Sequence, residues 1–230
     1  MSNGTLYIVS TPIGNLEDIT FRAVNILKKV NFIASEDTRR SSILLNHYSI
    51  KKSLVSYFEH NEIKKNPEII NRIICGEDCA LITDAGTPGI SDPAYKLIRN
   101  AIDNNIRVES IPGPSAVLTA LTSSGLPTDR FLFEGFLPPR KNRKSRLEKL
   151  NNQDATLIIF ERFNRINRTL NDLKLILGDR PAVIARELTK LHEELLRGSI
   201  SELLIYLEQN NLKGECVILI GKNKKNVYFN

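Results

Sequence analysis

The sequence predicts an α/β protein with two domains, and three observations support this prediction. Short apolar runs alternate with helical patterns in the first half of the chain, which is typical of a parallel sheet covered by helices. Gly125 and Pro127 then interrupt the pattern, and strands and helices follow in a mixed order. A chain of 230 residues is long enough for two cores, so we expect domains at 1–125 and 126–230.

The first domain is expected to hold a mostly parallel five-stranded sheet with helices on both faces. Its apolar runs have the length of buried strands, and apolar residues from Ile19 to Val30 repeat at the spacing of an amphipathic helix. The expected strands are 6–9, 32–34, 54–58, 80–83 and 107–111, and the expected helices are 15–30, 38–47, 62–74 and 92–104.

The second domain is expected to hold a mixed sheet, with a ligand cleft between the two domains. Ser199 and Glu202 have the spacing of a capping box at the start of the last helix. The expected strands lie near 131–136, 156–161, 181–188 and 215–221, and the expected helices lie near 142–151, 164–177 and 199–209.

Composition excludes several classes of protein. The chain is 25% charged and 41% hydrophobic, as in ordinary globular proteins, which argues against disorder or collagen. The N-terminus has no signal-peptide pattern, and no apolar run is long enough to span a membrane. The three cysteines form neither a disulfide framework nor a good metal site. We therefore expect a cytoplasmic protein without a metal or a membrane segment.

The net charge of +6 is unevenly distributed. Residues 1–125 carry thirteen basic and thirteen acidic side chains, whereas residues 126–230 carry nineteen basic and thirteen acidic ones. This asymmetry favours an anionic partner for the second half. A solvated basic surface without a partner explains the charge at least as well.

Three loops rich in glycine and proline follow the first, fourth and fifth expected strands. They are Thr11–Asn15, Asp84–Pro93 and Pro112–Ser115. In an open parallel sheet such loops meet at the carboxyl edge, where ligands bind. Glycine and proline also make ordinary turns, and any single loop fits that explanation better. Three such loops together favour a shared binding cleft.

The loops favour a ligand without phosphates. The dinucleotide pattern G-x-G-x-x-G and the P-loop are both absent, and Pro12, Pro88, Pro112 and Pro114 each remove an N–H donor. A site poor in donors suits an adenosine-bearing ligand such as S-adenosylmethionine better than NAD or ATP.

Two basic segments are candidate contacts for nucleic acid. Arg39 and Arg40 are expected in the first turn of a helix capped by Asp37 or Thr38. The helix dipole disfavours cations at this end, and an external phosphate would relieve that electrostatic cost. The segment 138–150 carries six basic side chains and one acidic one. A solvated helix face is an equally good explanation of that segment. Its candidate RNA contacts are Arg140, Lys141, Arg143 and Lys144, with Arg140, Arg143 and Lys144 expected along one face.

Nine segments in order carry a resemblance to a known family. They are LYIVSTPIGNLEDIT, SEDTR, HNE, ITDAGTPGISDPAY, IPGPSA, GLPTDRF, GFLPPR, ARELTK and KGE, between residues 6 and 215. The chain resembles the ribosomal RNA small subunit methyltransferase I family, in the tetrapyrrole-methylase-like class of S-adenosylmethionine enzymes. The resemblance implies 2′-O-methylation of a cytidine in the decoding region of 16S rRNA. The substrate would be 16S rRNA or the small ribosomal subunit, and the enzyme would be a homodimer.

The resemblance also implies site residues. One segment departs from the family pattern, because Asn164 stands where the family commonly has histidine between Glu161 and Arg165. The implied donor-binding residues are Pro12, Ile13, Gly14, Asp84, Gly86, Thr87, Ile90, Ser115, Ala116, Phe160, Ala185, Arg186 and Glu187. The candidates for a base that accepts the hydroxyl proton are Asp37, His60, Glu62, Asp84, Glu187 and Lys190.

Two other functions remain open from the sequence. A tetrapyrrole methyltransferase of the precorrin type would share the fold, but it would not need the basic segment. An RNA-binding ribosome-assembly factor without catalysis would keep the basic segment, but it would not bind the methyl donor.

Overall fold

The computed structural model describes residues 3–210 and 213–229, and the chain forms two compact units, Met1–Ser115 and Ala116–Asn230. This division precedes the expected one after residue 125, because helix α5 (Ala116–Ser124) packs on β8 (Pro181–Arg186) and β10 (Glu215–Ile220). Helix α5 was not predicted from the sequence. Its residues are apolar over most of the circumference, so they lack the stripe that marks an amphipathic helix.

All five strands of the first unit run parallel, in the order β3-β2-β4-β1-β5. This confirms the predicted parallel sheet. Because the strands share one direction, the loops that follow them gather at one edge. The strands are β1 (Thr5–Val9), β2 (Phe32–Ser35), β3 (Ser53–Ser56), β4 (Cys79–Ile82) and β5 (Arg107–Ile111).

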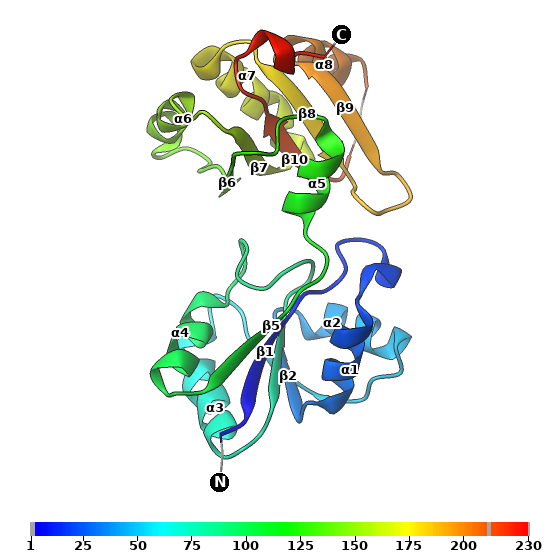
Figure 1. Cartoon of the computed structure of the whole chain (residues 1–230), viewed down its shortest axis with the longest axis vertical. Helices are drawn as coiled ribbons and strands as arrows, with labels where there is room; N and C mark the ends of the chain where they lie inside the picture. Colours follow the sequence, from blue (N-terminus) through cyan, green and yellow to red (C-terminus); the bar gives the residue numbers. More distant parts are fainter. Residues whose placement is uncertain (1–2, 211–212, 230) are drawn as a thin grey trace. The chain divides into compact units, whose positions relative to one another are not determined.

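Helices cover both faces of this sheet, α1 and α2 on one face and α3 and α4 on the other (Figure 1). Successive side chains of β1 point to opposite layers, so Leu6 and Ile8 pack with α3 and α4 while Tyr7 and Val9 pack with α1 and α2. The helices are α1 (Phe21–Lys29), α2 (Thr38–His47), α3 (Glu62–Ile74) and α4 (Tyr95–Asp103).

The expected helix 15–30 is two elements, the 3-10 turn η1 (Leu16–Asp18) and α1. Thr20 separates them because its side-chain oxygen accepts a hydrogen bond from the Ala23 N–H at 3.1 Å and caps α1.

The second unit holds a mixed sheet in the order β6-β7-β10-β8-β9, which confirms the predicted class. Strands β6 (Phe131–Phe136) and β7 (Thr156–Arg162) are parallel, and the other pairs are antiparallel. Strand β9 (Glu194–Ser199) was not predicted from the sequence. This strand lies at the sheet edge, pairs only with β8 and is largely half-buried, so it presents no long apolar run.

Three helices pack with the second sheet around one core, and they confirm the expected helices to within two residues. The capping box is also confirmed, because the Ser199 side chain and the Glu202 side chain each accept the other residue's backbone N–H. The helices are α6 (Arg143–Asn151), α7 (Ile166–Leu177) and α8 (Ile200–Gln209), with 3-10 turns η2 (Phe163–Arg165) and η3 (Lys225–Val227).

Candidate functional site

The three loops at the carboxyl edge of the first sheet are joined by direct contacts. Thr11 and Gly86 form an isolated bridge, with N–H to carbonyl distances of 2.9 and 3.0 Å. The Ser10 and Thr87 hydroxyls lie 2.9 Å apart, and the Thr87 hydroxyl also donates to the Pro114 carbonyl at 3.4 Å. The loops after β1, β4 and β5 therefore form one structure, as the sequence predicted.

Local sequence explains this close approach. Gly86 has φ +81°, a conformation that side-chain-bearing residues rarely adopt, and a Cβ there would lie 3.5 Å from the Ile13 side chain. A Cβ on Gly113 would lie 3.0 Å from the Ser10 Cβ, so a larger residue there would force the loop after β5 away from the end of β1.

The expected donor residues of the first unit lie on these loops. Pro12 and Gly86 are buried, Ile13, Asp84, Thr87 and Ser115 are half-buried, and Gly14 and Ile90 are exposed. The N–H groups of Thr11, Gly86 and Ile90 are used inside the chain, as donors to the carbonyls of Gly86, Thr11 and Thr87. The prolines on this edge carry no N–H, and apolar side chains and a hydroxyl lie beside them.

The expected donor residues of the second unit lie on three of its elements. Ala116 begins α5, and Phe160 on β7 makes edge-on contacts with the rings of Phe133 and Phe136. Ala185 is buried in β8, and Arg186 ends that strand, with Glu187 in the loop beyond it.

Carboxylates gather beside the joined loops. The Asp84 Oδ1 accepts the Asp37 N–H at 3.1 Å, and the Thr83 hydroxyl donates to Glu36 Oε2 at 2.9 Å. Burial raises the pKa of the Asp84 carboxyl. Burial, with the neighbouring charges of Glu36 and Asp84, raises the pKa of Asp92 to about 6.

Glu36 and Asp92 were not among the sequence candidates. The sequence signal for Asp92 is its place near the end of the second loop rich in glycine and proline, immediately before Pro93. Glu36 directly follows β2, and residues directly after parallel strands lie at the edge of the sheet where ligands bind. This position was the sequence signal for Glu36.

The first-turn arginines of α2 have carboxylate partners within the chain. Arg39 forms a two-pronged pair with Asp37, at 3.1 Å from Nε and 2.7 Å from Nη2, and Arg40 Nη1 lies 3.2 Å from Asp84 Oδ2. These carboxylates relieve the cost of the two cations within the chain, and the contact of Arg39 and Arg40 with RNA stays a prediction. The Arg39 guanidinium also holds the pKa of Asp37 well below its usual range, which makes Asp37 a poor base.

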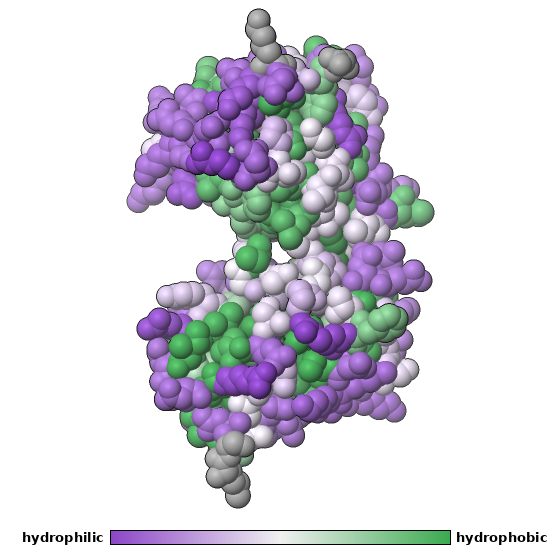
Figure 2. Space-filling view, in the orientation of Figure 1, coloured by the Kyte–Doolittle hydropathy of each residue, from purple (hydrophilic) through white to green (hydrophobic). Residues whose placement is uncertain are grey.

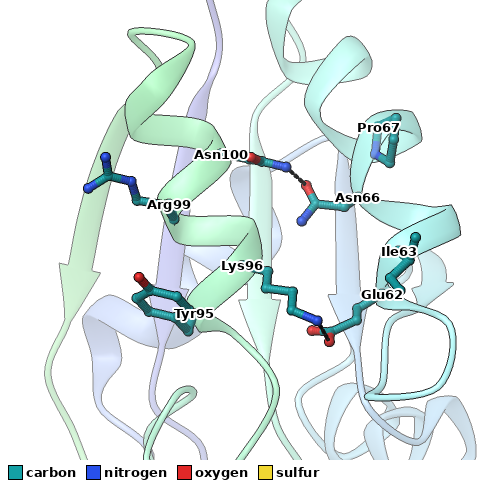
Figure 3. A pocket seen from close by; sticks show the side chains of 8 residues that line it. All are labelled: Glu62, Ile63, Asn66, Pro67, Tyr95, Lys96, Arg99 and Asn100. Atoms are coloured by element: carbon teal, nitrogen blue, oxygen red, sulfur yellow. Dashed lines mark hydrogen bonds and ion pairs between the residues drawn. The ribbon is translucent and has the colours of Figure 1, made fainter.

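Glu62 belongs to an ion pair in a groove of about 300 Å³ between α3 and α4. Figure 3 shows Glu62 and Lys96 pointing toward each other, with Lys96 Nζ 2.5 Å from Glu62 Oε1. Beside them the Asn100 amide donates to Asn66 Oδ1 at 3.0 Å. The Glu62 carboxylate is thus occupied by Lys96, which weakens the case for it as a proton acceptor. His60 is exposed and contacts the edge of the Phe58 ring.

Glu187 and Lys190 stabilise a strained loop after β8. Glu187 has φ +48°, and its Oε1 accepts the Glu215 N–H at 2.8 Å and a Lys190 hydrogen bond at 3.1 Å. Burial disfavours the charged forms of both side chains. The Glu215 N–H and Lys190 nevertheless lower the pKa of Glu187. The carboxylates of Glu215 and Glu187 likewise raise the pKa of Lys190. Neither group is a good base near neutral pH.

Arg143 requires a correction. We expected its side chain on an exposed face with Arg140 and Lys144, but it is 4% exposed and donates to Asp172, Thr169 and the Pro138 carbonyl. The helix begins at Arg143, and Asn142 before it has φ +63°, so helical spacing does not extend back to Arg140. Arg140, Lys141 and Lys144 are exposed, as is Asn164 in η2.

Two features are absent from the residues that the structure describes. No group of three or more His, Cys, Asp or Glu side chains in them is arranged to hold a metal ion. Among the same residues no helix combines the length and apolar character needed to cross a bilayer.

Known proteins resemble this chain over most of its length. A family model for tetrapyrrole (corrin/porphyrin) methylases matches residues 5–204. A relative from Halalkalibacterium halodurans, named ribosomal RNA small subunit methyltransferase I, is 50% identical over 96% of this chain and 78% of its own length. A relative of the same name from Thermotoga maritima is 47% identical over 95% of this chain and 99% of its own length.

Solved structures share the fold. A diphthine synthase has a TM-score of 0.75 at 13% identity, over 95% of this chain and 90% of its own. A uroporphyrin-III C-methyltransferase from Thermus thermophilus has a TM-score of 0.66 at 16% identity, over 95% and 97%. At these identities the likeness concerns the fold alone.

Proposed function

We propose a function from the premise that the chain belongs to the ribosomal RNA small subunit methyltransferase I family, within the tetrapyrrole methylases. The chain is a methyltransferase. Its proposed reaction transfers a methyl group from S-adenosylmethionine to the ribose 2′ oxygen of a cytidine in the decoding region of 16S rRNA, as free rRNA or within the small subunit. The family resemblance also supports a cytoplasmic homodimer.

The observation that carries the donor assignment is the joining of the three loops through Ser10, Thr87 and Pro114. The prolines of these loops offer no N–H to a phosphate, while Ile13 and Ile90 offer apolar contact for an adenosine. The Asp92 carboxylate beside these loops complements the positive sulfonium and ammonium groups of the donor. The residues present therefore fit S-adenosylmethionine.

The proposed chemistry is an in-line displacement at the donor's methyl carbon. The new bond joins this carbon to the 2′ oxygen, the carbon–sulfur bond breaks, and the hydroxyl proton passes to a base. Among the six sequence candidates we favour Asp84 as proton acceptor, because burial raises its pKa and it lies beside the donor loops. Ion-pair partners occupy Asp37, Glu62, Glu187 and Lys190, whereas the Arg40 partner of Asp84 does not offset the effect of burial on the pKa of Asp84.

The rRNA substrate is preferred to a tetrapyrrole for two reasons. The relatives that are 47–50% identical over nearly the whole chain carry the rRNA name, whereas the uroporphyrin-III methyltransferase is 16% identical. A small tetrapyrrole also has no need for the exposed cations Arg140, Lys141 and Lys144.

The test is to map 2′-O-methylation of rRNA in cells that lack the gene. We expect one cytidine in 16S rRNA to lose its methyl group, and the wild-type gene to restore it. Asp84→Asn should bind S-adenosylmethionine within about threefold of wild type by calorimetry and lose about 10²-fold or more in methyl transfer.

Three outcomes would contradict parts of this proposal. Unchanged rRNA methylation in the deletion strain would exclude the rRNA substrate, and transfer to a corrinoid precursor instead would favour the tetrapyrrole reading. No binding heat with S-adenosylmethionine would favour an assembly factor without catalysis. Weakened donor binding by Asp84→Asn would assign Asp84 to the donor and leave the substrate assignment intact.

A further inference from the structure

A second group of exposed cations lies in the second unit, outside the basic segment 138–150. Arg162 ends β7 and is exposed, and Arg168 in the first turn of α7 has a side chain that is 57% exposed. In the part of the chain that the structure describes, Arg162 has no ion-pair partner, and Arg168 has only Asp172 at 4.0 Å. The sequence analysis assigned no role to either residue.

The buried Arg143 connects this group to the basic segment. Its Nη1 donates to the Pro138 carbonyl at 3.2 Å, at the start of the basic segment. Its Nε donates to Asp172 Oδ2 and its Nη2 donates to the Thr169 hydroxyl, both at 2.7 Å and both on α7. One guanidinium therefore binds the loop 138–142 to the first two turns of α7.

Glu161 and Arg165 make a second connection beside the first. Glu161, 2% exposed, accepts the Thr169 hydroxyl at 2.7 Å, and Arg165 Nε lies 3.4 Å from its Oε1. Arg165 also donates to the Leu137 carbonyl at 3.4 Å. Glu161 and Arg165 are the residues that this chain keeps from the family motif around Asn164. Together they hold the turn η2 against Leu137, which precedes the basic segment.

The acidic side chains around these contacts are engaged. Asp172 binds Arg143, Glu134 binds Arg146, and Glu148 lies 3.9 Å from Lys144. Figure 2 shows a strongly hydrophilic surface over α6. Five exposed cations lie on the loop 138–142, the first turns of α6 and α7 and the end of β7, and within the described residues only Lys144 and Arg168 among them have an ion-pair partner, at 3.9 and 4.0 Å; they are Arg140, Lys141, Lys144, Arg162 and Arg168.

We propose that these five cations form one interaction surface for an RNA phosphate backbone, which we call the α6–α7 surface. Guanidinium and ammonium groups bind phosphate oxygens without reading sequence, and the contacts of the buried Arg143 and Glu161 connect the two parts of the surface. Asn164 is exposed between Arg162 and Arg165, so its departure from the family's histidine falls within this surface. The inference rests on the proposed rRNA substrate and extends its contacts to the β7–α7 turn.

The experiment compares the wild type with Arg162→Glu and Arg168→Glu, separately and together, for binding to small-subunit rRNA across a salt titration. We expect each change to weaken binding at least tenfold at low salt. The slope of log affinity against log salt should fall by about 0.7 to 0.9 for each lost phosphate contact. Affinity for S-adenosylmethionine should stay unchanged.

Lys174→Glu is the matched control, because it makes the same charge change at an exposed position near the other end of α7. We expect it to leave the slope within error of wild type. An equal loss in the control, or an unchanged slope in the double variant, would overturn the α6–α7 surface. Absence of salt-dependent RNA binding by the wild type would instead overturn the proposed function.

Discussion

Asp92 gives a pH dependence that can be measured. Its pKa is raised to about 6 by burial and by Glu36 and Asp84, whereas an unfolded chain releases the same proton near 3.8. The folded state therefore binds this proton more tightly, and Asp92 lowers the free energy of unfolding as pH rises from about 4 to 6. After allowance for solvent screening, we expect Asp92→Asn to be about 1 to 2 kcal/mol more stable than wild type at pH 7.5.

Urea unfolding at pH 4 and pH 7.5 checks this prediction. The advantage of Asp92→Asn should be nearly absent at pH 4, because the wild-type carboxyl is then protonated in the folded state and half protonated in the unfolded chain. Asp18→Asn, which removes an exposed carboxylate from η1, is the control and should have the same effect at both pH values. An Asp92→Asn advantage of equal size at both pH values would contradict the assignment.

Single residues also show where sequence reasoning failed. The meeting of the three loops rich in glycine and proline at one sheet edge was predicted correctly. The rule that loops after parallel strands share an edge needs only the identification of the strands. Burial of Arg143 could not be predicted from the sequence. Asn142 adopts a left-handed conformation, so the helical spacing begins only at Arg143. Its partners Thr169 and Asp172 come from α7, which is distant in the sequence. The raised pKa of Asp92 likewise depends on Glu36, which only the folded sheet brings near.

At the scale of elements, Arg143 determines how α6 is held. Replacing it by methionine leaves the Asp172 carboxylate and the Pro138 carbonyl without their donor. We expect Arg143→Met to lower the free energy of unfolding by about 2 to 4 kcal/mol and to speed amide exchange in α6. Arg140→Met, the same change at an exposed position, should cost less than about 0.5 kcal/mol. Equal costs for the two variants in urea unfolding would show that Arg143 does not hold α6.

The elements divide into those with a local signal and those without one. The five parallel strands are short apolar runs, and the capping box of α8 is a local spacing, so both could be read from the sequence. The edge strand β9 and the helix α5 have no such signal. Strand β9 depends on pairing with β8, and α5 depends on packing against β8 and β10.

For the whole molecule, the position of the charge excess matters more than its size. The first half of the chain is neutral by count, and its α2 arginines are paired with Asp37 and Asp84, whereas Arg140 and Lys141 have no ion-pair partner among the described residues. Two triple variants with the same change in net charge separate the two effects. One changes Arg140, Lys141 and Lys144 to glutamine, and the other changes the exposed Lys28, Lys29 and Lys51 of the first unit.

We expect the second-unit triple to lose about 10- to 100-fold in affinity for small-subunit rRNA at low salt, and its salt slope should fall by about two to three. The first-unit triple should keep the wild-type slope, because a uniform fall in net charge changes long-range attraction but removes no phosphate contact. Filter binding at several salt concentrations measures both quantities. If the two triples lose affinity and slope equally, the RNA responds to total charge, and no localised surface is needed. A selective loss in the second-unit triple requires that the RNA backbone contacts the basic segment itself.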